Sequence, residues 1–163
     1  MAIINGETPV KRKRSWYTLD EERQAHPPKG QLPPVRIEVV ANRQGRELVV
    51  GFTPYNEDDS PVRCSGEAVV SILVKQNEFV ASQLGDTSIT VTPSKYKRYR
   101  VGYWGDVRLM YVVRLFPDQM DVGMGSASLL MASMQESGYS FAVRVSFTPK
   151  VGQTITGEDD FLW

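Results

Sequence analysis

The feature that most constrains the fold is an alternation of apolar and polar side chains with a period of two. Its clearest instance runs from Tyr139 to Phe147, where aromatic and valine side chains occupy every second position. Successive side chains of a strand point to opposite faces, so this pattern predicts strands with one face in a core. The same alternation, and one nearly continuous apolar run, predict strands at 35–39, 48–52, 68–74, 87–91 and 107–116.

One segment carries helical signals instead. The run from Ser126 to Glu136 begins with a residue type that commonly caps helix N-termini, and Gly138 follows its last turn. A stretch at 14–24 is a weaker candidate helix, because its apolar face is thin. The predicted fold class is therefore α+β: a mostly antiparallel β-sheet with one or two helices packed on it, preceded by a flexible basic and Pro-rich arm.

Changes of composition predict three regions in these 163 residues. Residues 1–34 hold two Pro-Pro pairs, which remove backbone donors and favour polyproline II, so we interpret them as a flexible arm. Residues 35–150 are expected to form a single compact β-rich domain, and residues 151–163 an acidic-aromatic C-terminal tail. No apolar run follows the N-terminal cations, so no signal peptide is expected, and no segment has the roughly 20 apolar residues that span a bilayer.

The formal net charge is zero, so an electrostatic partner must be selected by local patches. Two clusters of cations provide such patches: Lys11, Arg12, Lys13 and Arg14, and then Lys95, Lys97, Arg98 and Arg100. The first cluster is compatible with a nuclear localisation signal, a nucleic-acid-binding arm or a headgroup-binding patch, and the sequence alone does not separate these three.

Aromatic residues accompany the second cluster of cations. They are Tyr96, Tyr99, Tyr103 and Trp104, and the last two lie in a turn bracketed by glycines. Cations attract phosphate or anionic headgroups, and exposed aromatic rings stack on bases or settle at a membrane interface. We therefore predict lipid or ribonucleoprotein binding by the cations, with partner contact by the aromatic rings.

Catalysis and metal binding have few candidate residues. One cysteine and one histidine are a poor supply for a zinc site, which needs about four ligands. His26 lies in the Pro-rich arm, where nothing would hold its tautomer for a hydrolase triad. Cys64 precedes a predicted strand, so a buried structural thiol is expected there. The sequence predicts no enzyme, no catalytic residue, no metal and no cofactor.

A resemblance to a known family emerges between Leu84 and Asp118. In order, this segment holds a Leu-Gly pair, a proline, the basic-aromatic run, a Gly-Tyr-Trp-Gly turn and an alternating strand with Leu-Met. It resembles the central segment of rhabdovirus matrix proteins. The matching positions are Gly85, Pro93, Tyr99, Arg100, Gly102, Tyr103, Gly105, Leu109 and Met110.

The resemblance implies a non-enzymatic viral structural protein. It would self-associate, condense the nucleocapsid and link it to the inner face of the envelope membrane. The implied partners are the viral nucleocapsid or ribonucleoprotein, an anionic membrane surface and further copies of the chain. The implied locations are the virion, the host cytoplasm and the inner membrane face, and the nucleus is a further location that the sequence leaves open. Lys29 and Val35 follow the Pro-Pro pairs where a late-budding motif has tyrosine, which suits a plant-infecting type.

Two other functions stay open. The chain ends in acidic and aromatic residues that would serve as a partner-docking tail: Asp159, Asp160, Phe161 and Trp163. Bacterial and phage single-stranded-DNA-binding proteins often end in such a tail, so single-stranded nucleic acid is a further candidate partner. A small viral capsid protein, with 11–14 as its RNA-binding arm, ranks lower, because four cations neutralise little of a genome's charge.

Overall fold

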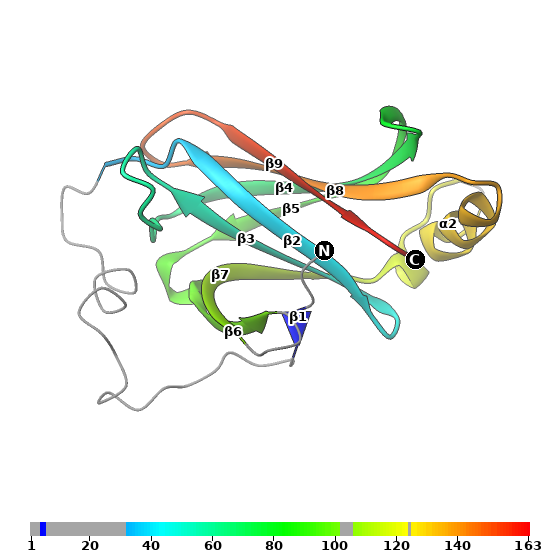
Figure 1. Cartoon of the computed structure of the whole chain (residues 1–163), viewed down its shortest axis with the longest axis horizontal. Helices are drawn as coiled ribbons and strands as arrows, with labels where there is room; N and C mark the ends of the chain where they lie inside the picture. The colour runs from blue at the N-terminus through cyan, green and yellow to red at the C-terminus, as the bar shows by residue number, and fades with distance from the viewer. Residues whose placement is uncertain (1–3, 6–31, 102–105, 124) are drawn as a thin grey trace.

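The computed structural model describes residues 4–5, 32–101, 106–123 and 125–163. These form two antiparallel sheets. The first has five strands in the order β1 (Ile4–Asn5), β6 (Lys97–Val101), β7 (Asp106–Leu115), β3 (Glu47–Tyr55) and β2 (Arg36–Gln44). The second has four strands in the order β5 (Phe79–Val91), β4 (Gly66–Gln76), β8 (Ser140–Pro149) and β9 (Ile155–Phe161). Figure 1 shows the sheets stacked as a sandwich.

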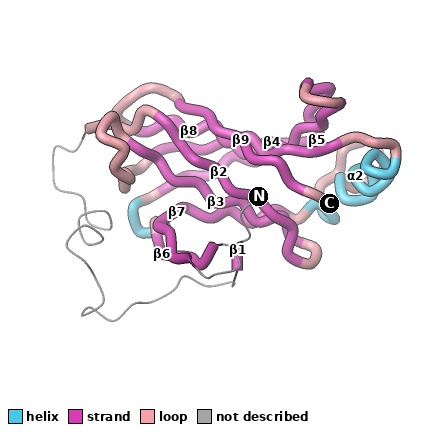
Figure 2. Tube along the Cα trace, viewed as in Figure 1, coloured by secondary structure: helices cyan, strands magenta, loops and turns pink. Residues whose placement is uncertain are grey.

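The helix α2 (Ala127–Glu136) lies at one end of this sandwich (Figure 2). The Ser126 side chain caps its N-terminus by accepting a hydrogen bond from the Leu129 N–H at 3.2 Å. Gly138 follows the helix with a φ of +91°, a conformation that glycine adopts without steric cost. Met131, in the middle of the helix, is fully buried against the core. Two single 3₁₀ turns, η2 (Pro93–Lys95) and η3 (Pro117–Gln119), complete the described elements.

The core lies between the two sheets, where the inward positions of the alternating strands meet. Phe52 of β3 contacts Tyr111 of β7, with ring centroids 5.3 Å apart, and Phe147 of β8, at 5.7 Å. All three side chains are fully buried. Aromatic side chains bury large areas, so this cluster from both sheets contributes strongly to holding the sandwich together.

One long side of the sandwich is closed because β2 and β9, from different sheets, lie next to each other (Figure 1). The Ala41 N–H at the edge of β2 donates to Oδ2 of Asp159 in β9 at 2.8 Å. Burial raises the pKa of Asp159, and this hydrogen bond acts in the opposite direction. At Gly157 the strands are so close that a Cβ would lie 2.9 Å from the Ile37 carbonyl oxygen. The sandwich is therefore sealed here by backbone approach and a carboxylate.

The predicted fold class is confirmed: the structure is a mostly antiparallel β protein with a helix packed on it. All six predicted strands and the helix at 126–136 correspond to described elements. The weaker candidate helix at 14–24 lies outside the described residues. Residues 4–5 of the predicted arm pair with β6 as β1, and 155–161 of the predicted tail form β9. The C-terminal segment is thus part of the second sheet.

Candidate anion-binding surface

Strand geometry divides the basic-aromatic run between two faces of the first sheet. On β6, Lys97 lies opposite Met110 and Arg98 opposite Leu109 of β7. Leu109 packs against the core, whereas Met110 belongs to a separate cluster on the outer face. Directly opposed residues in an antiparallel pair point to the same face, so Lys97 faces outward and Arg98 inward. These two predicted cations therefore do not share one surface.

Two of the predicted contact aromatics are buried, which corrects their expected role. Tyr96 is 4% exposed and its ring lies 5.0 Å from that of Tyr111, inside the core. Burial raises the pKa of Tyr96 far above its ordinary value. Tyr99 is 9% exposed and packs with Met110, Val40 and Val112 on the outer face of the first sheet. Neither ring is available to stack on a base or enter a membrane interface.

Lys97 and Arg108 together form the strongest candidate surface for an anion. Both are exposed, and they are diagonal neighbours on the outer face, because Tyr99 lies opposite Arg108 and Lys97 opposite Met110. Diagonal neighbours in such a ladder are about 7–8 Å apart, close enough for both to reach one phosphate. No carboxylate whose side chain the structure describes pairs with either cation. We call Lys97 and Arg108 the outer cationic pair.

An arginine and a tyrosine extend the surface around this pair. The Arg36 guanidinium lies 4.2 Å from the ring centroid of Tyr55, a cation–π contact. The guanidinium also pairs with Asp59 at 3.0 Å and Glu38 at 3.2 Å, so its charge is already compensated. The electrostatic influence of Arg108 reaches the Tyr55 hydroxyl and lowers its pKa, against the larger effect of burial. With Arg36 paired to two carboxylates, the outer cationic pair remains the candidate for binding an anion on this face.

Arg108 is not among the site residues predicted from the sequence, although the alternation of strand residues around it indicated an outward-facing side chain. The alternation of 107–115 places apolar residues inward and leaves Arg108 and Arg114 on the opposite face. Arg114 pairs with Glu47 at 2.7 Å, and Arg108 forms no such pair with a carboxylate whose side chain is described. Counting clustered cations along the sequence missed a cation that the register brings beside Lys97.

The other predicted cations have different positions. Lys95 is exposed in η2, and its ammonium donates to the Thr90 carbonyl oxygen at 2.9 Å. Arg98 is half-buried. Arg100 lies opposite Val107 in the ladder of β6 and β7. The cluster of Lys11, Arg12, Lys13 and Arg14, together with Tyr103 and Trp104, lies outside the described residues.

The predicted C-terminal docking residues are engaged with their own chain. Phe161 is 2% exposed and its ring stacks on Phe141 of β8, with centroids 5.8 Å apart. Asp160 pairs with Lys75 at 3.3 Å. The Arg43 guanidinium lies 4.1 Å from the centroid of the Trp163 ring, and the Trp163 backbone N–H donates to Oε1 of Gln135. Asp159, described above, accepts from β2. These contacts hold the C-terminal segment against the rest of the folded chain.

No group of three or more His, Cys, Asp or Glu side chains that could hold a metal occurs among the described residues. Asp59, in the loop after β3, pairs with Arg36 at 3.0 Å. No described helix is long and apolar enough to cross a membrane.

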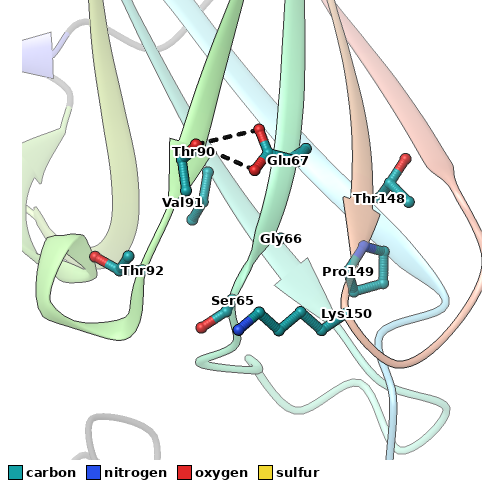
Figure 3. A pocket seen from close by; sticks show the side chains of 9 residues that line it. All are labelled: Ser65, Gly66, Glu67, Thr90, Val91, Thr92, Thr148, Pro149 and Lys150. Carbon is teal, nitrogen blue, oxygen red and sulfur yellow. Dashed lines mark hydrogen bonds between the residues drawn. The ribbon is translucent and has the colours of Figure 1, made fainter.

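A small pocket lies at one end of the second sheet (Figure 3). Its volume is about 290 Å³, and its lining combines hydroxyl side chains with one carboxylate and one ammonium group. The Thr90 hydroxyl donates to both carboxylate oxygens of Glu67, at 3.1 and 3.3 Å, so the carboxylate already has a hydrogen-bond partner among the lining residues of the pocket. Lys150 is the lining cation, and its side chain is exposed. The pocket therefore offers hydroxyl, carboxylate and ammonium groups for hydrogen bonding.

The Cys64 thiol is expected to react slowly in the folded protein. Burial raises its pKa to about 11, and only the thiolate is an effective nucleophile. The thiolate fraction at pH 8 should therefore be about 100-fold lower than in the unfolded chain. The rate of modification by a chromogenic disulfide reagent at pH 8, with and without urea, measures this difference. Equal rates would show that the thiol is accessible and ordinary, contrary to the prediction.

Comparison with known proteins identifies no family. No protein-family model matches the chain, and no curated protein matches it. Among solved structures, the chain has a weak similarity to Spo0M, a sporulation control protein from Bacillus subtilis, with a TM-score of 0.37 and 7% sequence identity. The match covers 80% of this chain and 49% of that chain, so this chain spans about half the length of that structure. A likeness this distant carries no functional argument.

Proposed function

We propose that the chain is a non-enzymatic matrix-type viral structural protein. It self-associates, binds the nucleocapsid and attaches it to the inner face of an envelope membrane, in the virion and at the host membrane. The resemblance between 84 and 118 to rhabdovirus matrix proteins supports this role. The observation that carries the binding step is the outer cationic pair, Lys97 and Arg108, which is exposed and has no partner among the carboxylates whose side chains the structure describes.

Phosphate is the chemistry shared by both proposed partners. Lipid headgroups and the ribonucleoprotein backbone each present phosphate oxygens that lysine and arginine recognise. A cation near an anionic membrane surface contributes about 1 kcal/mol. The net charge of the chain is zero, so attraction to either partner depends on where the cations lie. An outward-facing pair on a broad sheet can meet an extended anionic surface without rearrangement of the fold.

Reversing the charge of the outer cationic pair should abolish most binding to anionic vesicles. Losing two contributions of about 1 kcal/mol each lowers affinity by about 30-fold, and the introduced carboxylates add repulsion. We expect at least this loss for the Lys97→Glu/Arg108→Glu variant. The measurement is co-sedimentation with vesicles of phosphatidylcholine containing or lacking phosphatidylserine, at about physiological ionic strength.

The matched control is Arg46→Glu/Lys150→Glu, which changes net charge equally at exposed positions away from this face. It should retain affinity within about threefold. Equal losses in both variants would show a general charge effect and contradict a site at Lys97 and Arg108. A parallel titration with fluorescent oligo-dT separates the two phosphate sources. Tight oligonucleotide binding without vesicle pelleting would replace the matrix role by single-strand binding, although Tyr96 and Tyr99 are buried away from bases.

A further inference from the structure

The strand β5 is the most open edge in the described structure. It is 13 residues long and, in the second sheet, pairs only with β4. It carries a single charged side chain, Asp86, and contains no proline or lysine. Soluble proteins usually protect such edges, because the free N–H and C=O groups are a template for another strand. A long edge with so little protection requires an explanation.

The other sheet edges are either covered or shorter. The closed side of the sandwich places β2 beside β9, and the Asp159 carboxylate takes up a free N–H of β2. At the opposite edge of the first sheet, β1 pairs with β6. Among the described strands, β5 exposes the longest edge without such a cover.

Only the second half of β5 is regular enough to accept a further strand. Register shifts against β4, between Ile72 and Leu73 and between Val74 and Lys75, mark irregular pairing in the first half. Figure 1 shows that this hairpin end curls away from the sheet. Bulges increase local twist and discourage edge pairing. The uninterrupted ladder covers residues 85–91, and Ser88 is its middle residue.

The Lys95 contact shows which backbone groups face the open edge. Its ammonium reaches the Thr90 carbonyl oxygen at 2.9 Å from outside the sheet. Backbone groups of successive residues in a strand point to alternate sides, so those of Asp86, Ser88 and Thr90 all point outward. A symmetric antiparallel partner centred on Ser88 would place its own Ser88 opposite Ser88, and its Asp86 opposite Thr90.

We propose that a second copy of this chain pairs with β5 in this register, so that the two four-stranded sheets become one continuous sheet across a two-fold axis at Ser88. The strand is self-complementary there, because each outward N–H meets an outward carbonyl oxygen of the other copy once the Lys95 ammonium releases Thr90. The axis keeps the two Asp86 carboxylates apart and brings each near the Lys95 ammonium of the other copy. A net charge of zero adds no general repulsion.

This inference rests on the proposed function for its biological purpose, since self-association is part of a matrix role. The two can nevertheless fail separately. The dimer uses the β5 edge, whereas vesicle binding uses the outer cationic pair. A wild-type dimer that ignores vesicles would refute the function alone, and a monomer that binds vesicles would refute the dimer alone.

The test removes one outward backbone donor. Proline at an edge position with an outward N–H keeps the β4–β5 ladder but cannot donate to a second copy. Sedimentation velocity from about 1 to 100 µM should show a dimer for the wild type and for Ser88→Ala, which retains the N–H. The Ser88→Pro variant should dissociate at least about 100-fold more readily. A wild-type monomer at about 100 µM, or a dimer unaffected by Ser88→Pro, would overturn the proposal.

Cross-linking keeps the test decisive if the proline variant does not fold. Opposed residues in a hydrogen-bonded antiparallel pair have Cα atoms about 5.5 Å apart, which suits a disulfide. Under mild oxidation, Ser88→Cys should form a covalent dimer, whereas Ser82→Cys, in the irregular half of β5, should not. Equal cross-linking of the two variants would indicate random collision and contradict the register.

Discussion

Replacing Phe161 by alanine is expected to lower the free energy of unfolding by about 4 kcal/mol. The side chain is 2% exposed, and its ring stacks on Phe141 at the end of β9. Truncation removes this apolar contact and leaves a cavity that neighbouring strands can only partly fill. For a chain of this size, the loss corresponds to about 10 °C in melting temperature. Urea denaturation followed by circular dichroism measures it.

Leu162 provides the matched control one residue further on. Its side chain is 70% exposed, so Leu162→Ala should change stability by less than about 0.5 kcal/mol. A free partner-docking tail would give a different result, in which both substitutions leave unfolding unchanged and affect only binding to another protein. Unchanged stability in Phe161→Ala would therefore restore the tail hypothesis and remove β9 from the core.

The difference between the predicted tail and the observed strand has a physical cause. The inward positions of β9 are Ile155, Gly157, Asp159 and Phe161, so apolar side chains occur only at its ends. The middle positions face β2 at close range, where a Cβ at Gly157 would be crowded and a carboxylate at Asp159 takes up a backbone N–H. The neighbouring strand β2, which is more than 100 residues away in sequence, therefore determines which residues fit at these middle positions of β9. Local alternation cannot reveal it.

The candidate site was only partly predictable for a related reason. Composition correctly marked Lys97 as an exposed cation, but it grouped Tyr96 and Tyr99 with it as surface residues. Strand alternation would have separated neighbouring residues of β6 onto two faces. It could not have placed Arg108 beside Lys97, because that requires the register of β6 against β7. Several positions of the matrix resemblance also serve packing: Met110 is 1% exposed, and Leu109 packs against the core.

Replacing Gly66 by alanine should be nearly as destabilising as the Phe161 change, at about 3 kcal/mol. Gly66 begins β4, between β5 and β8. A Cβ there would overlap the Thr148 carbonyl oxygen and lie 2.8 Å from both the Phe147 ring and the Pro149 Cα. Two of these three contacts are with backbone, which cannot move without disturbing the ladder to β8. Thermal unfolding of the variant measures the cost.

A second glycine separates crowding from backbone conformation. Gly45, in the turn between β2 and β3, has a φ of +61°, and a Cβ added there would meet no atom within 4 Å. Gly45→Ala should therefore cost only about 1 kcal/mol, from the left-handed conformation alone. If Gly66→Ala cost no more than Gly45→Ala, β4 and β8 would have room to separate at this end. That result would contradict the close packing of the second sheet, on which the position of β5 at the sheet edge depends.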